Sequence, residues 1–212
     1  MALHHFNALT GLFVALAVYA GSLGVAHAAD NQDLLTISEH DVVLGEKDAP
    51  LTIIEYASMT CGHCGDFHNQ VLPKLKKNYI ETGKVNFVLR DMPWDPLALA
   101  VSKISRCAPN DQFYNFISAF FDGQKGWVRS EDPVSELKKI ARLGGMSGEK
   151  VEECLNDSEI HTLVIQSREV GIETLSINST PTFFIGHDEV IRGNVGFEKM
   201  ANIIDEALKR AE

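Results

Sequence analysis

The chain lacks an excess of positive charge. Its 212 residues include 19 Lys and Arg against 29 Asp and Glu, which gives a formal net charge of −10 at pH 7. A nucleic-acid-binding surface needs a basic face, so this balance argues against a nucleic-acid partner. The sequence also has no internal repeat, no low-complexity tract and no long block of like charge. These absences argue against a repeat protein or a charged tail. The length of 212 residues is enough for one substantial domain or a small domain carrying an insertion.

Lys and Arg are also absent from the start of the chain, before the almost wholly apolar or small run Leu9–Val25. The run is followed by Ala26-His27-Ala28, the small-x-small pattern typical of a secretory signal peptide, so we predict cleavage after Ala28. An uncleaved membrane anchor is the alternative, because about 20 apolar residues can span a bilayer. No cysteine lies at the cleavage site, which argues against a lipoprotein. Export would place the protein in a compartment where disulfides persist, such as the periplasm.

Cysteine is scarce: the chain has four, which allow three pairings. Two of them enclose a dipeptide in Cys61-Gly62-His63-Cys64, directly after the apolar run Leu51–Ala57. This order predicts a buried strand, a turn and an amphipathic helix that begins at the cysteines. The apolar positions of that helix recur at spacings of three and four, at Cys64, Phe67, Val71, Leu75 and Tyr79.

Two cysteines at a helix start are suited to thiol–disulfide exchange, which needs an attacking thiolate. A free cysteine has a pKa near ~8.5, and a helix N-terminus or a nearby cation lowers it to roughly 3.5–7.5. We therefore predict that Cys61 is the attacking thiolate, favoured by backbone N–H groups and by His63. Cys64, one turn into the helix, is the predicted resolving thiol. Glu55 lies in the apolar strand and is the predicted acceptor of the Cys64 proton; the alternative is an edge-strand glutamate that reaches solvent.

The remaining pattern predicts a small α/β sheet interrupted by a helical block. The strand signals stop after residue 90 and return at residue 182, where two short strands flank the tight turn Gly186-His187-Asp188. Pro73 is expected to kink the helix that starts at Cys61. The predicted strands are residues 42–44, 51–57, 84–90, 182–185 and 189–192, and the predicted helices are residues 61–82, 97–107, 112–121, 133–143, 148–155, 158–173 and 197–208.

Three segments carry a resemblance to a known family: YASMTCGHCGDFH, FVLRDMPWDPLALAVSKISRCA and STPTFFIG. With them the chain resembles the DsbA family of exported thiol oxidases, in the thioredoxin superfamily, over about residues 40–210. The resemblance implies that Cys61 is the exposed nucleophile, Cys64 its buried partner and Glu55 the buried acid. It also implies that Thr180-Pro181 is the residue and cis-proline that face the disulfide, where the backbone pairs with substrate peptide.

The resemblance implies further expectations about the rest of the molecule. Cys107 and Cys154 resemble the extra disulfide of alphaproteobacterial members, with two buried free thiols as the alternative. We expect no cofactor and no metal. The expected partners are reduced or unfolded exported proteins, and a membrane quinone reductase of the DsbB type that reoxidises the protein. A monomer is expected.

The predicted fold class is therefore α/β, a thioredoxin fold with an inserted all-helical domain. We assign residues 1–28 to a signal peptide and residues 29–40 to a flexible leader. Residues 41–92 and 174–212 form the predicted thioredoxin-like domain, and residues 93–173 the predicted helical insertion.

Two other classes of function are alternatives to an oxidase. The best-known family members carry Pro-His between the cysteines, whereas this chain carries Gly62-His63, as protein disulfide isomerases do, so an isomerase or reductase is the main alternative. A metal-binding or chaperone module is a further one. Structural zinc usually takes four Cys or His ligands, and Cys107 and Cys154 have no ligand-like neighbours at short spacing.

Several other side chains are predicted to have structural roles. His68, His161 and His187 are predicted on the surface. Met59 is predicted either in the core or in an apolar rim for substrates. Trp127, Phe113, Phe116 and Phe120 are predicted to form the core of the helical insertion.

Overall fold

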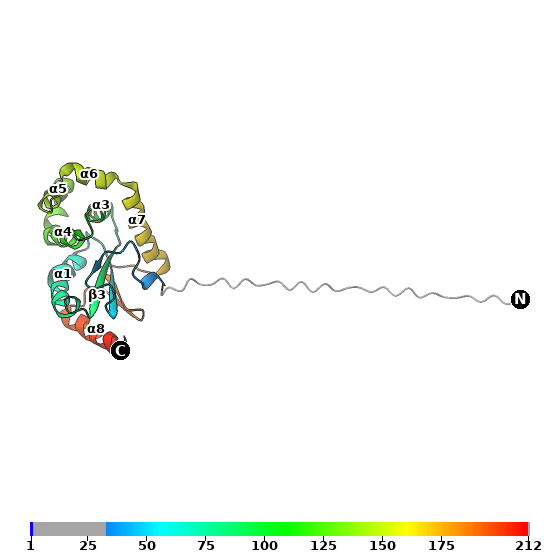
Figure 1. Ribbon diagram of the computed structural model, residues 1–212. Coiled ribbons are helices and arrows are strands. Elements are labelled where there is room, and N and C mark those ends of the chain that lie inside the picture. The colour runs from blue at the N-terminus through cyan, green and yellow to red at the C-terminus, as the bar shows by residue number, and fades with distance from the viewer. Residues whose placement is uncertain (2–32, 212) are drawn as a thin grey trace.

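The sheet at the centre of the protein has five strands in the order β1-β3-β2-β4-β5. The structure is a computed structural model that describes Met1 and residues 33–211, so the predicted signal peptide lies outside the described residues apart from Met1 (Figure 1). All five predicted strands agree with the observed ones to within one residue at each end. The strands are β1 (Val43–Leu44), β2 (Leu51–Ala57), β3 (Val85–Asp91), β4 (Thr182–Ile185) and β5 (Glu189–Arg192).

The two central strands explain the apolar runs in the sequence. β2 and β3 are parallel along their whole length, from Leu51 opposite Val85 to Ala57 opposite Asp91. All seven residues of β3 are buried, as expected where helices cover both faces of a parallel pair. β4 is antiparallel to β2, and β5 returns antiparallel to β4 after the turn at Gly186. The carboxyl end of β2 leads directly into the cysteine motif.

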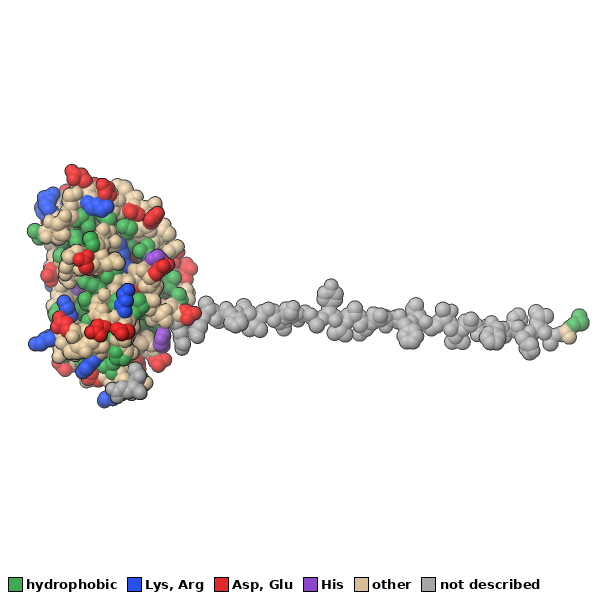
Figure 2. All heavy atoms as spheres, in the orientation of Figure 1, with side chains coloured by type: hydrophobic (Ala, Val, Ile, Leu, Met, Phe, Trp, Pro, Cys, Tyr) green, Lys and Arg blue, Asp and Glu red, His purple; other side chains and the backbone are tan. Residues whose placement is uncertain are grey.

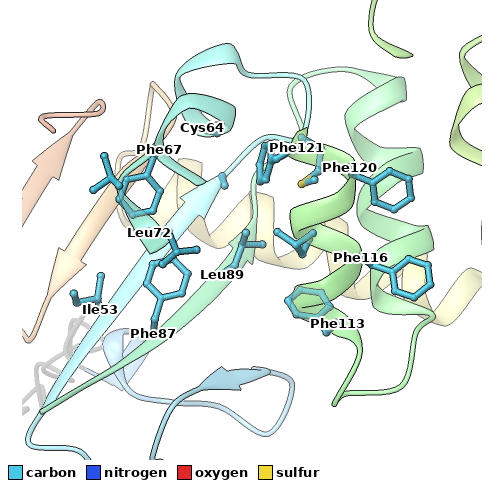
Figure 3. Close-up of a cluster of buried hydrophobic side chains, with 14 of the residues drawn as sticks. Ile53, Cys64, Phe67, Leu72, Phe87, Leu89, Phe113, Phe116, Phe120 and Phe121 are labelled. Atoms are coloured by element: carbon cyan, nitrogen blue, oxygen red, sulfur yellow. The ribbon is translucent and has the colours of Figure 1, made fainter. Parts of the chain in front are cut away.

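Helices cover both faces of the sheet. One face packs against α1 (Gly62–Gln70), α2 (Leu72–Leu75) and α8 (Phe197–Ala211), and its core continues into the helical block, as Figure 3 shows for side chains of α1, the sheet and α4. The other face buries a smaller cluster around Tyr56 and Phe184. The thioredoxin-like layering predicted from sequence is therefore present.

The helical block follows β3 and precedes β4, and arches over one end of the sheet (Figure 1). Phe113, Phe116, Phe120 and Trp127 are buried in it, as predicted. The predicted end of this helix at residue 121 is wrong, because α4 runs on through Gly123 to Trp127. An interior glycine costs a helix only about 1 kcal/mol, and burial of a large side chain such as that of Trp127 outweighs this cost. The helices are α3 (Pro96–Arg106), α4 (Phe113–Trp127), α5 (Pro133–Leu143), α6 (Gly148–Asn156) and α7 (Ser158–Glu169).

The helix predicted over residues 61–82 is divided near Pro73. α1 ends at Gln70, and Pro73 lies in the first turn of α2, where its missing N–H group leaves no hydrogen bond unmade. A π-helical turn, Lys76–Ile80, completes the segment. A second π-helical turn, Val170–Thr174, follows α7.

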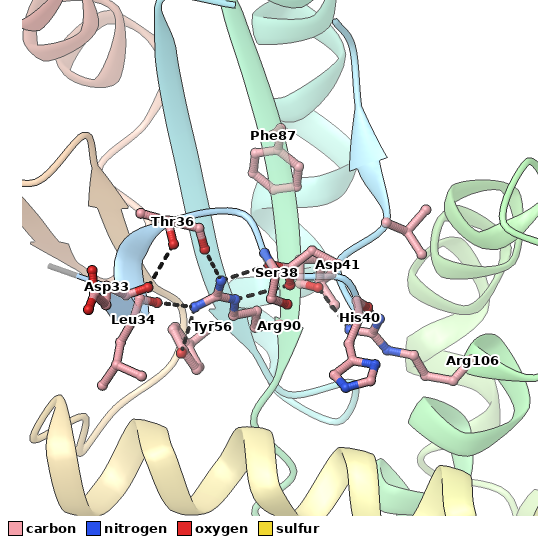
Figure 4. A network of polar contacts seen from close by, with 12 residues as sticks. Asp33, Leu34, Thr36, Ser38, His40, Asp41, Tyr56, Phe87, Arg90 and Arg106 are labelled. Atoms are coloured by element: carbon pink, nitrogen blue, oxygen red, sulfur yellow. Dashed lines mark hydrogen bonds and ion pairs between the residues drawn. The ribbon is translucent and has the colours of Figure 1, made fainter. Parts of the chain in front are cut away.

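The leader differs from the prediction over the part that the structure describes. Residues 33–41 are held by Arg90 of β3, whose guanidinium donates hydrogen bonds to the Leu34 and Thr36 carbonyls and to the Asp41 carboxylate (Figure 4). The Asp41 and Arg90 side chains are 4% and 11% exposed. Burial alone would raise the pKa of Asp41, but hydrogen bonds from Arg90 and its charge outweigh burial and lower it. The predicted flexible leader is thus anchored to the sheet from residue 33 onward.

The surface charge and the helix lengths can be compared with what a nucleic-acid partner or a membrane span would require. On the face shown in Figure 2, acidic and basic side chains are scattered among apolar ones and form no single basic patch. Over the described residues, no helix combines the length and the apolar character needed to cross a membrane.

Candidate active site

Cys61 begins the active-site helix. It follows β2 through a turn in which the Cys61 N–H donates to the Ser58 carbonyl at 3.0 Å, and it occupies the N-cap of α1 with extended backbone. Its Sγ lies 3.3 Å from the Thr180 carbonyl oxygen, across 119 residues of sequence. Cys61 is half-buried and Cys64 is fully buried, and both thiols are free in the structure.

The surroundings split the acidities of the two thiols. The pKa of Cys61 falls from 9.0 to about 5, chiefly through the hydrogen bond with the Cys64 side chain, against the opposing effect of burial. The Thr180 side chain and the backbone N–H groups of Cys64 and His63 lower it further. Burial, followed by the Cys61 hydrogen bond and the negative charge of Glu55, raises the pKa of Cys64 well above its ordinary value. The reduced site therefore pairs an accessible thiolate with a buried thiol.

The dipeptide between the cysteines is exposed. Gly62 has no atom within 4 Å of the position a Cβ would take. His63 acts on Cys61 through its backbone N–H, while its imidazole is exposed. A role for the His63 side chain in stabilising the thiolate stays a prediction.

Thr180 and Pro181 lie beside the cysteines, joined by a cis peptide bond. Trp94 also belongs to this edge of the site, because its Nε1–H donates to Thr180 Oγ1 at 3.1 Å. The Trp94 side chain is 41% exposed and lies in the segment between β3 and α3. Sequence reasoning missed this residue, although it stands in the proline-flanked segment Asp91–Pro96 that follows the second long strand.

Glu55 is fully buried and does not reach solvent. Its Oε2 lies 2.7 Å from His68 Nε2, and the His68 ring stacks on Phe121 with centroids 4.3 Å apart. The prediction that His68 is a surface residue is wrong. Residues i and i+4 share a helix face, so His68 lies on the same buried face as Cys64. That spacing was the signal for its burial.

The exposure of the side chains decides the remaining predictions for histidine and methionine. His161 and His187 are exposed, as predicted. Met59 is 1% exposed and belongs to the core, so the alternative of a substrate-facing rim is wrong.

The other two cysteines form a disulfide. It joins Cys107, just after α3, to Cys154 in α6, with the Cα atoms 5.8 Å apart and a sequence separation of 47. The bridge ties two helices of the insertion together, and the pair is therefore separate from the dithiol at the start of α1.

A metal site would need several ligands close together. Within residues 33–211, no group of three or more His, Cys, Asp or Glu side chains is placed to hold a metal ion. The arrangement at Cys61 and Cys64 is instead that of a dithiol with two different acidities, which is suited to thiol–disulfide exchange.

Comparison with known proteins agrees with this geometry. A family model described as thioredoxin matches residues 37–206. The chain belongs to the thioredoxin family. The crystal structure of Wolbachia pipientis alpha-DsbA1 superposes with a TM-score of 0.79 at 31% sequence identity, covering 86% of this chain and 98% of that one. This likeness places the chain among the DsbA-type members.

Curated relatives extend the comparison. A Rickettsia conorii protein named "Putative protein-disulfide oxidoreductase" is 30% identical over 174 residues, which are 82% of this chain and 62% of that relative. The chain thus spans less than two thirds of the length of that relative. Disulfide bond formation protein D of Bacillus subtilis is 26% identical over 176 residues, which are 79% of this chain and 77% of that protein.

Proposed function

We propose that the protein is an exported thiol:disulfide oxidoreductase that introduces disulfide bonds into folding proteins through Cys61 and Cys64. The observation that carries this proposal is the difference in pKa between the Cys61 and Cys64 thiols. Cys61, with a pKa of about 5, is a good leaving thiolate at neutral pH, and a disulfide that yields a stable thiolate is readily reduced by its substrate. The names of the Rickettsia and Bacillus relatives support the same activity.

The reaction starts from the oxidised pair. A substrate thiolate attacks Cys61 Sγ, the Cys61–Cys64 bond breaks, and Cys64 leaves and takes up a proton. A second substrate thiolate then attacks the substrate sulfur of the mixed disulfide and releases Cys61 as a thiolate. The substrate loses two electrons and the protein gains them, so no further cofactor is needed.

Three neighbouring features serve these steps. Glu55 supplies or accepts the proton of Cys64, since its charge already acts on that thiol. Substrate peptide binds along Thr180 and Pro181, beside Cys61. His63 and Gly62 sit between the cysteines and tune the stability of the disulfide.

The proposal extends to compartment and partners. Residues 1–28 act as an export signal, so the protein works in the periplasm. It acts there as a monomer. Reduced or unfolded exported proteins are its substrates, and a DsbB-type membrane quinone reductase restores the disulfide.

Refolding of a reduced, unfolded multi-cysteine protein tests the activity. The oxidised protein is expected to restore the substrate's activity, and Cys61→Ser is expected to abolish the effect. An inactive oxidised protein would contradict the proposal. A protein that instead restores only a substrate with scrambled disulfides, and that is a dimer by size, would be an isomerase.

A further inference from the structure

Gln124 links the helical insertion to the turn that carries Cys61. It lies on α4, in the turn that packs against the start of α1, and is 5% exposed. Its side-chain Nε2 donates two hydrogen bonds, to the Met59 carbonyl at 2.8 Å and to the Cys61 carbonyl at 2.9 Å. A single side-chain amide from the insertion thus binds two backbone carbonyls of the turn that carries Cys61, two residues apart in the sequence.

Gly65 leaves the space that Gln124 occupies. A Cβ at Gly65 would lie 2.5 Å from Gln124 Oε1, far inside van der Waals contact. A glycine inside a helix is destabilising relative to alanine. The close approach of the Gln124 amide gives a physical reason for glycine at this position.

The orientation of the Cys61 carbonyl affects the start of α1 and the surroundings of the Cys61 sulfur. It also accepts the Gly65 N–H at 3.1 Å, which is the first hydrogen bond of α1. Its orientation therefore fixes how the next backbone N–H groups, those of His63 and Cys64, are aimed at the Cys61 sulfur. Losing the Gln124 donors would let this peptide group rotate away from that arrangement.

We propose that Gln124 is a positioning residue through which the helical insertion holds the Cys61 turn and sets the balance between the dithiol and the disulfide. The inference rests on the proposed function and adds a part of the insertion to it. Gln124 does not touch the reacting sulfur; it acts through the Cys61 carbonyl.

Two variants disturb the position or the hydrogen bonds of the Gln124 amide, one by changing Gln124 itself and one by changing the glycine that it packs against. Gln124→Met keeps the volume and removes the donor, and Gly65→Ala keeps the donor but displaces it. One hydrogen bond is worth about 1 kcal/mol, or roughly fivefold in an equilibrium constant. We expect each variant to shift the equilibrium with glutathione about fivefold or more toward the disulfide form, and to raise the midpoint of the thiolate absorbance titration. The double variant is expected to shift little further, because both changes break one contact.

Gln166→Met, on the exposed surface of α7, is the matched control and should match the wild-type equilibrium. If Gln124→Met and Gly65→Ala are folded by circular dichroism and both keep the wild-type equilibrium within twofold, the inference is overturned. If one of them does not fold, the other decides in the same way. A wild-type protein whose Cys61 titrates as an ordinary thiol would contradict the proposed function instead, so the two failures are distinguishable.

Discussion

Glu55 Oε2 and His68 Nε2 lie 2.7 Å apart in the core, with side chains that are at most 1% exposed. The remaining polar atoms, Glu55 Oε1 and His68 Nδ1, have no hydrogen-bond partner among the described residues. Cys64 lies one helical turn before His68, and the charge of Glu55 acts on its thiol. Two ionisable side chains are therefore buried near the thiol that must lose or gain a proton.

His68→Leu should destabilise the protein and slow the reaction of the Cys64 thiol. Removing one partner of a buried hydrogen bond typically costs about 1–3 kcal/mol, because the other is left without a partner. We expect a loss of that size in urea unfolding, and slower resolution by Cys64 of a mixed disulfide formed on Cys61.

The double variant Glu55→Leu/His68→Leu separates the two effects. Replacing both partners by apolar groups is often close to neutral for stability, so it should recover much of the stability lost in His68→Leu while resolution stays slow. Recovery of both the stability and the rate would show that the pair has no part in proton transfer.

The reduction potential should change its pH dependence near pH 5. Between pH 5 and the higher pKa of Cys64, reduction takes up one proton for two electrons, so the potential should fall by about 30 mV per pH unit; below pH 5 two protons are taken up and the slope approaches about 59 mV. Redox titrations against glutathione from pH 4 to pH 8 measure this. A single slope of about 59 mV throughout would mean that Cys61 has an ordinary acidity.

The same pKa predicts how the stability of the reduced protein depends on pH. Because the pKa of Cys61 is lowered on folding, from 9.0 to about 5, the stabilisation is complete above pH 9, shrinks as the pH falls, and is lost near pH 5. The oxidised protein has no such contribution. The difference in free energy of unfolding between the reduced and oxidised forms should therefore move in favour of the oxidised form as the pH falls from 8 to 5, as measured by urea titration.

The disulfide of the insertion should act on stability. Opening a loop of 47 residues is expected to cost about 4 kcal/mol. Cys107→Ala/Cys154→Ala should therefore unfold about 10 °C earlier, since 1 kcal/mol shifts the midpoint by roughly 2–4 °C at this size. Alkylation of the wild-type protein without reductant should leave both cysteines unmodified in the intact mass. Labelling of both would contradict the bridge.

Arg90→Met should release the leader. Keeping Asp41 buried without its partner would cost about 3–5 kcal/mol, so the leader should leave the sheet instead. Because the pKa of Asp41 is lowered in the folded protein, the wild-type pair stabilises above the ordinary carboxyl pKa of 3.8, and this contribution is lost as the pH falls below it. Proteolysis near residues 33–41 should therefore be faster in the variant at pH 7, and the gap between variant and wild type should narrow at pH 3. An unchanged cleavage rate at pH 7 would contradict this anchoring role.

Local patterns in the sequence determined most of the fold. β2 could be read to the residue because a central parallel strand is buried on both faces and so appears as an unbroken apolar run. The position of the two cysteines at a helix start follows from the spacing of apolar residues after Cys64. The same reading could not foresee that α4 continues through Gly123, because the packing of that helix outweighs its weak local propensity.

Only the tertiary structure decided which distant residues meet. Cys61 with Thr180 and Glu55 with His68 both join different elements, and Arg90 reaches a leader about 50 residues away. A polar side chain carries no local mark of the partner it will find, because its burial depends on the packing of other elements around it. The sequence thus determined that a dithiol stands at a helix start, while tertiary packing decided the burial of Cys64 and the contact of Cys61 with Thr180, which help to set the two pKa values apart.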